Sequence, residues 1–223
     1  MGHTAPDVQN ITGQDRTVTH FFDLPILPGM QLPWRRLLAD VPQLAPPDRL
    51  PPELAVFIAG YRCHLQADWF WVKQIFFPVF GPLSQWDTFP RRLYLHNVLR
   101  AYLDQQILPN LSPDMGSELD RVQPDGWLPF VPAGGLDRWR DILARQLHPG
   151  AASETVEVFA SRHGLSPDMF YQMLASEERL DQEIFRRLPR QVLAEYRSQI
   201  LSDHVRLVLD SLRPGAASPR DPS

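Results

Sequence analysis

The stretch FIAGYRCHLQADWFW, residues 57–71, decides the fold class of this chain. Its large apolar side chains lie on nearly every side of a helical wheel, which is typical of a helix buried at the centre of a helical protein. We expect this helix to run from Glu53 to about Phe77, because Pro78 and Gly81 follow and both residue types stop helices.

The same helix carries two metal-competent side chains, His64 and Asp68. Residues i and i+4 lie one above the other on a helical face. An ionisable pair among large apolar neighbours costs free energy unless it has partners, and a bound cation satisfies an imidazole and a carboxylate together. The alternative is an ordinary buried ion pair between these two residues, completed by other polar groups.

Composition restricts the type of protein. The chain has 223 residues, of which 43% are hydrophobic, and this is enough for one large domain or two small ones. A formal net charge of -4 without a long basic run indicates no nucleic-acid surface. Cys63 is the one cysteine, so a metal site within one chain must use histidine and carboxylate ligands. No secretory signal and no bilayer-spanning apolar run are visible, so we expect a cytoplasmic protein.

Helical periodicity and turn signals predict further helices, and no convincing strand. Thr88 is the expected N-cap of a second long helix that stops at Pro109. The segment after it, residues 110–135, is rich in Pro, Gly and Asp and is expected to be a long loop anchored by Trp127 and Phe130. The remaining helices are expected at residues 136–147, 153–163, 166–180 with an extension to 188, and 189–212.

The predicted fold is therefore all-α, a multi-helix bundle with a long ordered N-terminal loop over residues 1–31. That loop lacks helical or alternating periodicity, yet it is too apolar near His20 for a disordered segment. We expect a single domain over residues 1–212, within which residues 136–212 could form a C-terminal helical subdomain. Residues 213–223 are expected to be a disordered tail, because they are rich in Pro, Ser and Gly.

Three of the seven histidines lie in contexts that could face a shared interior: His20, His64 and His96. The next group lies at helix ends or on polar helices and is assigned to the surface: His148, His163 and His204. His3 stands so close to the terminus that its position is uninformative.

Ala5-Pro6-Asp7, then His20, then Gly60-Tyr61-x-x-His64-x-x-x-Asp68 resembles the zinc-dependent phospholipase C family, which is related to the S1/P1-type nucleases. The resemblance covers roughly residues 5–77. It implies a helical bundle of the phospholipase C/P1 nuclease type with metal ions at its mouth. It also implies that Asp7, His20, His64 and Asp68 hold one zinc ion, and that Asp7 and Asp68 could bridge or hydrogen-bond its water.

The chain departs from the family at the other metal positions. The family uses the amino-terminal residue and an early His on a first helix, for which this chain has no room, unless His3 substitutes poorly for that His or an upstream segment is missing. It also has a second His-x-x-x-acid pair, and the nearest equivalent here is His96-x-x-x-Arg100, in which a base replaces the acid. We therefore expect one metal site to be retained and the others to be lost or altered.

The resemblance implies a zinc-dependent phosphoester hydrolase that acts on a phosphoester or phospholipid. Tyr61, His96 and Arg100 are candidates for lining its cavity, although packing in the core is the favoured explanation for Tyr61 and His96, and a solvated helix surface is the favoured explanation for Arg100. The alternative function is a non-catalytic helical scaffold or interaction protein derived from the same family, with a protein partner that the sequence does not identify.

Overall fold

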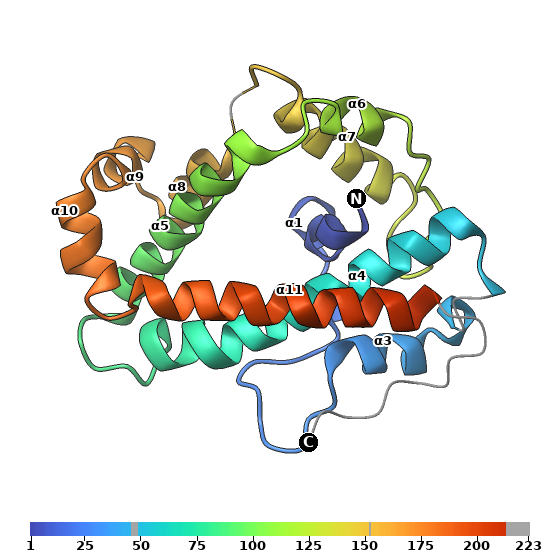
Figure 1. Ribbon diagram of the computed structural model, residues 1–223, viewed down its shortest axis with the longest axis horizontal. Coiled ribbons are helices and arrows are strands. Elements are labelled where there is room, and N and C mark those ends of the chain that lie inside the picture. Colours follow the sequence, from blue (N-terminus) through green and yellow to red (C-terminus); the bar gives the residue numbers. More distant parts are fainter. Residues whose placement is uncertain (46–48, 152, 213–223) are drawn as a thin grey trace. The chain divides into compact units, whose positions relative to one another are not determined.

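The computed structural model describes residues 1–45, 49–151 and 153–212, and all regular structure in these ranges is helical, without a strand (Figure 1). This confirms the predicted all-α class. No helix in the described ranges combines the length and the apolar character needed to cross a membrane. The predicted tail, residues 213–223, lies outside the described residues.

The chain divides into two compact units, each built from separate stretches of sequence. Unit 1 comprises residues 1–70, 122–140 and 196–223, and unit 2 comprises residues 71–121 and 141–195. The expected subdomain at residues 136–212 does not coincide with either unit. Three of the four boundaries fall inside helices, in α4, α7 and α11, which linker and loop signals in the sequence could not indicate.

Unit 1 is organised around α4 (Pro52–Trp71), the helix that contains residues 57–71. Its side chains Phe57, Ile58, Tyr61 and Leu65 are buried in one apolar cluster. Residues of α3 (Pro33–Asp40), of the start of α7 (Gly135–Leu147) and of the second part of α11 (Arg190–Leu212) complete this cluster. Trp127 and Phe130, predicted to be loop anchors, do pack on this core: their rings lie 5.0 Å from Phe57 and 6.2 Å from Tyr61, respectively.

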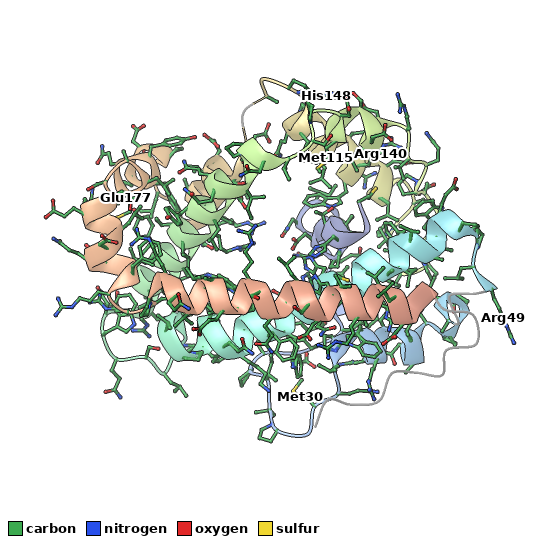
Figure 2. The ribbon with its side chains drawn as sticks, in the orientation of Figure 1. Met30, Arg49, Met115, Arg140, His148 and Glu177 are labelled. Carbon is green, nitrogen blue, oxygen red and sulfur yellow. The ribbon has the colours of Figure 1, made fainter. Side chains whose placement is uncertain are left out.

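The N-terminal segment is not the long loop that the sequence predicted. It forms three short helices: η1 (Gly2–Val8), α1 (Gln9–Thr12) and α2 (Arg16–His20). Asp15 caps α2 by accepting a hydrogen bond from the Thr17 backbone N–H. Helices of one or two turns are too short to show periodicity and are marginal in isolation, so tertiary contacts must stabilise them. Only residues 21–32 form an extended loop, on which Met30 lies (Figure 2).

Two glycines allow η1 to lie directly against α4. A Cβ atom on Gly2 would stand 2.1 Å from the backbone oxygen of Phe57, and one on Gly60 would stand 3.0 Å from the backbone nitrogen of His3. Trp139 of α7 holds the same segment from another direction, since its indole N–H donates to the Thr4 carbonyl at 2.8 Å. Contacts between backbones at this distance require residues without a side chain.

Unit 2 is built around α5 (Phe89–Ile107), whose predicted N-cap Thr88 is confirmed. The π-helical stretch η4 (Val72–Phe80) precedes it, and the buried guanidinium of Arg92 donates to the carbonyl oxygens of Phe80, Gly81 and Pro82 where that stretch ends. The unit also contains the end of α7, the start of α11 and six short elements: η5 (Leu108–Asn110), α6 (Met115–Asp120), α8 (Thr155–His163), α9 (Pro167–Leu174), α10 (Glu177–Leu180) and η6 (Asp181–Phe185). α6 lies inside the segment predicted to be a loop.

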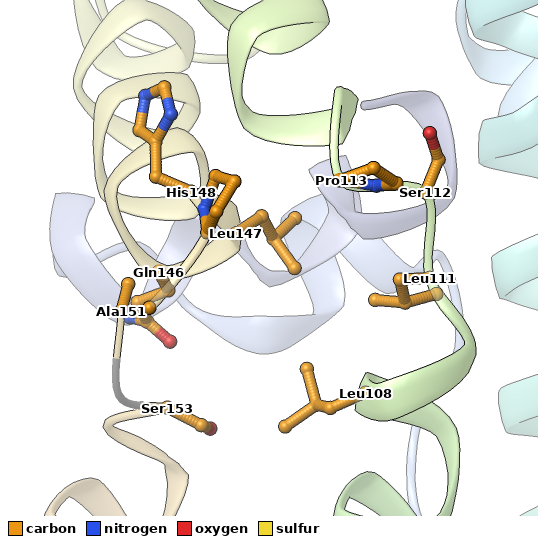
Figure 3. Close-up of a pocket in the computed structure, with 11 residues that line it drawn as sticks. Leu108, Leu111, Ser112, Pro113, Gln146, Leu147, His148, Ala151 and Ser153 are labelled. Carbon is orange, nitrogen blue, oxygen red and sulfur yellow. The ribbon is translucent and has the colours of Figure 1, made fainter.

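A hollow of about 220 Å³ lies in unit 2, between Leu108 and Leu111 on one side and Leu147 at the end of α7 on the other (Figure 3). None of its described lining residues is Asp, Glu, Lys or Arg. His148, at the end of α7, contributes to the lining, and its Nε2 atom is 3.0 Å from the Asp120 carboxylate. A hollow lined in this way offers no cluster of charges or metal ligands for hydrolytic chemistry.

Candidate metal centre

Three predicted ligands meet in unit 1. Asp7 of η1, His20 of α2 and His64 of α4 each offer a ligand atom, and these atoms lie within 4.8 Å of one another. The ring centroids of His20 and His64 are 5.4 Å apart. Two imidazoles on one tetrahedral zinc, with Zn–N bonds of about 2.1 Å, have centroids about 5 Å apart. The three side chains are therefore spaced as the ligands of a single ion would be.

His64 is oriented by the backbone of η1. Its Nδ1 atom is 2.8 Å from the carbonyl oxygen of His3. A carbonyl oxygen only accepts hydrogen bonds, so Nδ1 carries the proton and Nε2 keeps its lone pair. Metal-binding histidines typically hold their second ring nitrogen in this way. The close approach that Gly2 and Gly60 permit thus determines which nitrogen of His64 is free to bind a metal.

His20 is buried, and like His64 it carries its proton on Nδ1. Its Nδ1 atom lies 3.0 Å from the Thr19 hydroxyl, which itself donates to the carbonyl of Arg16 at 3.3 Å, so His20 Nδ1 is the donor. Its Nε2 atom faces the Asp7 carboxylate at 3.8 Å. Burial, together with the charge of Arg16 and the neighbouring His64, lowers the pKa of His20 to about 2, so the ring is neutral and its lone pair is available.

Tyr61, a candidate for lining the cavity, positions α2. Its side chain is fully buried, and its hydroxyl donates to the Thr19 carbonyl at 2.5 Å, which holds the end of α2 on α4. Burial raises the pKa of Tyr61 well above its ordinary value, so the hydroxyl stays protonated. Tyr61 therefore stabilises the backbone that carries His20.

Asp68, the fourth ligand implied by the family resemblance, lies outside this group of three. Its carboxylate forms an ion pair with the guanidinium of Arg16. Arg16 also stacks on the Phe22 ring, 4.5 Å from its centroid. The structure therefore brings Asp7, His20 and His64 together. Asp68 lies one turn after His64 on α4 and pairs instead with Arg16 of α2.

His96 and Arg100 belong to unit 2 and have different surroundings. The His96 ring is buried among Trp71, Phe76 and Phe80, and its Nε2 atom accepts a hydrogen bond from the Trp71 indole at 2.8 Å. The Nδ1 atom therefore carries the proton, and it has no hydrogen-bond partner among the described residues. Arg100 is exposed and stacks on Phe159 at 4.8 Å. The packing interpretation fits His96 better than a ligand role.

We expect His96 to make the protein sensitive to acid. Burial, with a smaller contribution from Arg100, lowers the pKa of His96 from 6.5 to about 3. Between these values the unfolded chain binds a proton that the folded chain rejects, so stability falls by about 1.4 kcal/mol per pH unit as the pH drops below 6.5. His96→Gln keeps an acceptor for the Trp71 indole and does not titrate.

Urea unfolding of the metal-free protein at pH 7 and pH 5 measures this effect. The free energy of unfolding of wild type should fall by more than that of His96→Gln over the same interval. Equal losses in the two proteins would show that the His96 ring is not kept neutral in the fold.

Two further histidines lie beside the candidate metal centre: His3, considered above only as a poor substitute for the family's early His, and His204, which was assigned to the surface. The His3 ring is 6.0 Å from that of His64 and 5.3 Å from that of His204, measured between centroids. The assignment of His204 to the surface is wrong: it is half-buried, and its Nε2 atom is fully covered. A periodic signal was present, because Tyr196, Ile200, His204 and Leu207 are spaced as one face of a helix.

The chain matches none of the family models, curated proteins or solved structures with which it was compared. The resemblance to zinc-dependent phospholipases C therefore depends on the motif residues alone. The observation that bears on function is the grouping of Asp7, His20 and His64, which the motif placed in one site and the fold brings together.

Proposed function

We propose that unit 1 binds a divalent metal ion, zinc in the first instance, through Asp7, His20 and His64, and that it hydrolyses phosphoesters. The observation that carries this proposal is the convergence of the three ligand atoms within 4.8 Å. Two imidazoles and one carboxylate form a common donor set of catalytic zinc sites, which keep a further position open for water or substrate. The same donor set also binds Fe²⁺, so the ion is identified by measuring the metal content of the purified protein.

The surroundings of the centre support phosphoester chemistry. A zinc ion in such a site lowers the pKa of water to about 7 and thus supplies a nucleophile at neutral pH. The Asp7 side chain is one-third exposed, so the centre is open to solvent on that side. The Arg16 guanidinium, also about one-third exposed, places a positive charge and several N–H donors near His20, where a phosphoryl oxygen would be recognised.

The loop after His20 favours an amphiphilic substrate. Residues 24–34 contain no charged side chain, and Leu24 and Leu27 are 48% and 58% exposed. Leu24 is four residues from His20, so chain connectivity alone keeps its Cα atom within about 14 Å of the Cα atom of His20. Exposed apolar side chains at this distance suit the acyl region of a phospholipid more than a fully soluble phosphoester.

The test compares metal-free and zinc-loaded protein on two substrates, a soluble aryl phosphodiester and phosphatidylcholine vesicles. Hydrolysis that appears with stoichiometric zinc and is absent in Asp7→Asn would support the proposal. Leu24→Ser/Leu27→Ser should reduce hydrolysis of vesicles but not of the soluble diester. Zinc binding without hydrolysis of either substrate would contradict the enzymatic function, and absence of zinc binding would contradict the metal centre itself.

One observation favours the alternative, a non-catalytic scaffold that retains a structural metal. Asp68 forms an ion pair with Arg16, so the site has only three protein ligands, Asp7, His20 and His64, and the positive charge of the Arg16 guanidinium lies beside it. A positive charge beside a metal position weakens the binding of a second cation. In this case the metal would stabilise the packing of η1 and α2 on α4 and would have no role in catalysis.

Substitutions at the Arg16–Asp68 pair test the role of Asp68. Arg16→Met should tighten zinc binding by ~10-fold or more, because it removes a nearby positive charge and releases the carboxylate. Asp68→Asn alone should change the affinity little, whereas Asp68→Asn added to Arg16→Met should remove part of the gain. Zinc competition with a chromophoric chelator measures all four proteins. A large loss of affinity in Asp68→Asn alone would instead show that Asp68 is a ligand in the wild-type chain.

A further inference from the structure

The histidines of unit 1 form a continuous series from α2 to α11. The centroid distances are 5.4 Å from His20 to His64, 6.0 Å from His64 to His3, and 5.3 Å from His3 to His204. The first two members belong to the candidate metal centre. The imidazoles of the last two are outside it and have no role in the proposed function; only the backbone carbonyl of His3 takes part, by orienting His64.

His204 reaches this series because α11 lies along α4 within unit 1 (Figure 1). The hydroxyl of Tyr196 donates to the Ala67 carbonyl at 2.8 Å, and Ile200 and Leu207 are buried on the same face of the helix. The His204 ring is hydrogen-bonded to the backbone of Cys63. The fold therefore fixes His204 between Tyr196 and Leu207, facing α4.

The two ring nitrogens of His204 are in different situations. The bond to the Cys63 backbone uses one nitrogen, which donates to the Cys63 carbonyl, because the N–H of a residue in the middle of α4 is already bonded within the helix. Nε2 is buried and has no hydrogen-bond partner among the described residues. Nε2 therefore keeps its lone pair, as does Nε2 of His64, whose Nδ1 donates to a backbone carbonyl.

We propose that His3 and His204 form a second cation position, adjacent to the centre of Asp7, His20 and His64, that binds a divalent transition metal such as Zn²⁺. Their centroid distance of 5.3 Å is close to that of His20 and His64. Both distances agree with the value of about 5 Å for two imidazoles on one tetrahedral ion. A buried imidazole lone pair requires a donor or a metal ion, and the neighbouring group is another imidazole.

The expected ligand class follows from the donors. Imidazole nitrogen suits zinc, copper, nickel and cobalt, and it does not suit magnesium or calcium, which prefer oxygen. His3 is exposed, so water can complete the coordination of an ion held by these two rings. The inference goes beyond the proposed function, because it concerns the number of ions and not the reaction.

The test counts the ions bound by the full chain. The protein is stripped with chelator and titrated with Co²⁺, and binding is followed by visible absorption and by calorimetry. We expect two ions per chain in the wild type, one in His204→Gln, and two in the control His163→Gln, which changes a histidine of unit 2. His3→Gln should also reduce the count to one, and it provides a second variant in case His204→Gln fails to fold.

The outcomes separate this inference from the proposed function. A wild-type count of one that is lost in Asp7→Asn but kept in His204→Gln overturns the second position and leaves the first centre intact. A count of two that persists in both His3→Gln and His204→Gln also overturns it. A wild-type count of zero overturns both proposals. Two ions that fall to one in either histidine variant, with Asp7→Asn losing the other, support both positions.

Discussion

His64→Ala is expected to bind zinc at least ~100-fold more weakly than the wild-type chain, with loss of any zinc-dependent hydrolysis. Removing a partner that only orients a metal ligand already costs ~10–100-fold in affinity, and this change removes the ligand itself. It also leaves the His3 carbonyl without the imidazole N–H at 2.8 Å. Competition with a chromophoric chelator gives the affinity, and plasma mass spectrometry gives the zinc content of the purified protein.

His148→Ala is the matched control for this prediction. His148, which Figure 2 labels, lies in unit 2. Its Nε2 atom is 3.0 Å from the Asp120 carboxylate, so it is also a histidine paired with a carboxylate. Its side chain is 41% exposed, and it has no part in the group of three. Equal zinc affinities in wild type, His64→Ala and His148→Ala would contradict the assignment of the metal to His64.

A large loss of zinc affinity is also expected from a substitution at Gly2, a residue without a side chain that is not itself a metal ligand. Gly2→Ala would place a Cβ atom 2.1 Å from the Phe57 backbone oxygen, so η1 must move away from α4. Asp7 and the His3 carbonyl are both on η1, and both would shift away from His64. We expect a loss in zinc affinity of ~10–100-fold, comparable to the loss of an orienting partner. Gly60→Ala, with a closest contact of 3.0 Å, should have a smaller effect of the same kind.

Gly29→Ala separates this effect from general destabilisation. Gly29 has φ +84°, and a Cβ atom added there would meet nothing within 4 Å, so its substitution strains the backbone without displacing η1. It should cost about 1–2 kcal/mol in the free energy of unfolding and leave zinc affinity unchanged. Thermal unfolding with and without zinc measures both quantities. A Gly2→Ala protein with wild-type zinc affinity would show that the position of η1 does not control the centre.

The candidate centre was predictable in part because its residues carry recognisable chemistry. His64 and Asp68 were selected by their i, i+4 spacing on an apolar helix, and Asp7 and His20 by their order in the motif. Spacing along one helix indicates that two side chains share a face, but it does not indicate which partner each side chain finds. Asp68 shares the face of His64, yet Arg16 of α2 takes its carboxylate.

Periodicity and motif order were enough to predict the helical class, the central helix and three metal-competent residues, because both are properties of positions along the chain. Tertiary contacts account for the other features. They formed η1 and α2 from a segment without periodicity, divided the chain into units at boundaries that mostly fall inside helices, and placed His204 beside His3. The physical reason is that these features depend on contacts between segments distant in sequence, such as Tyr196 with Ala67, which no local pattern encodes.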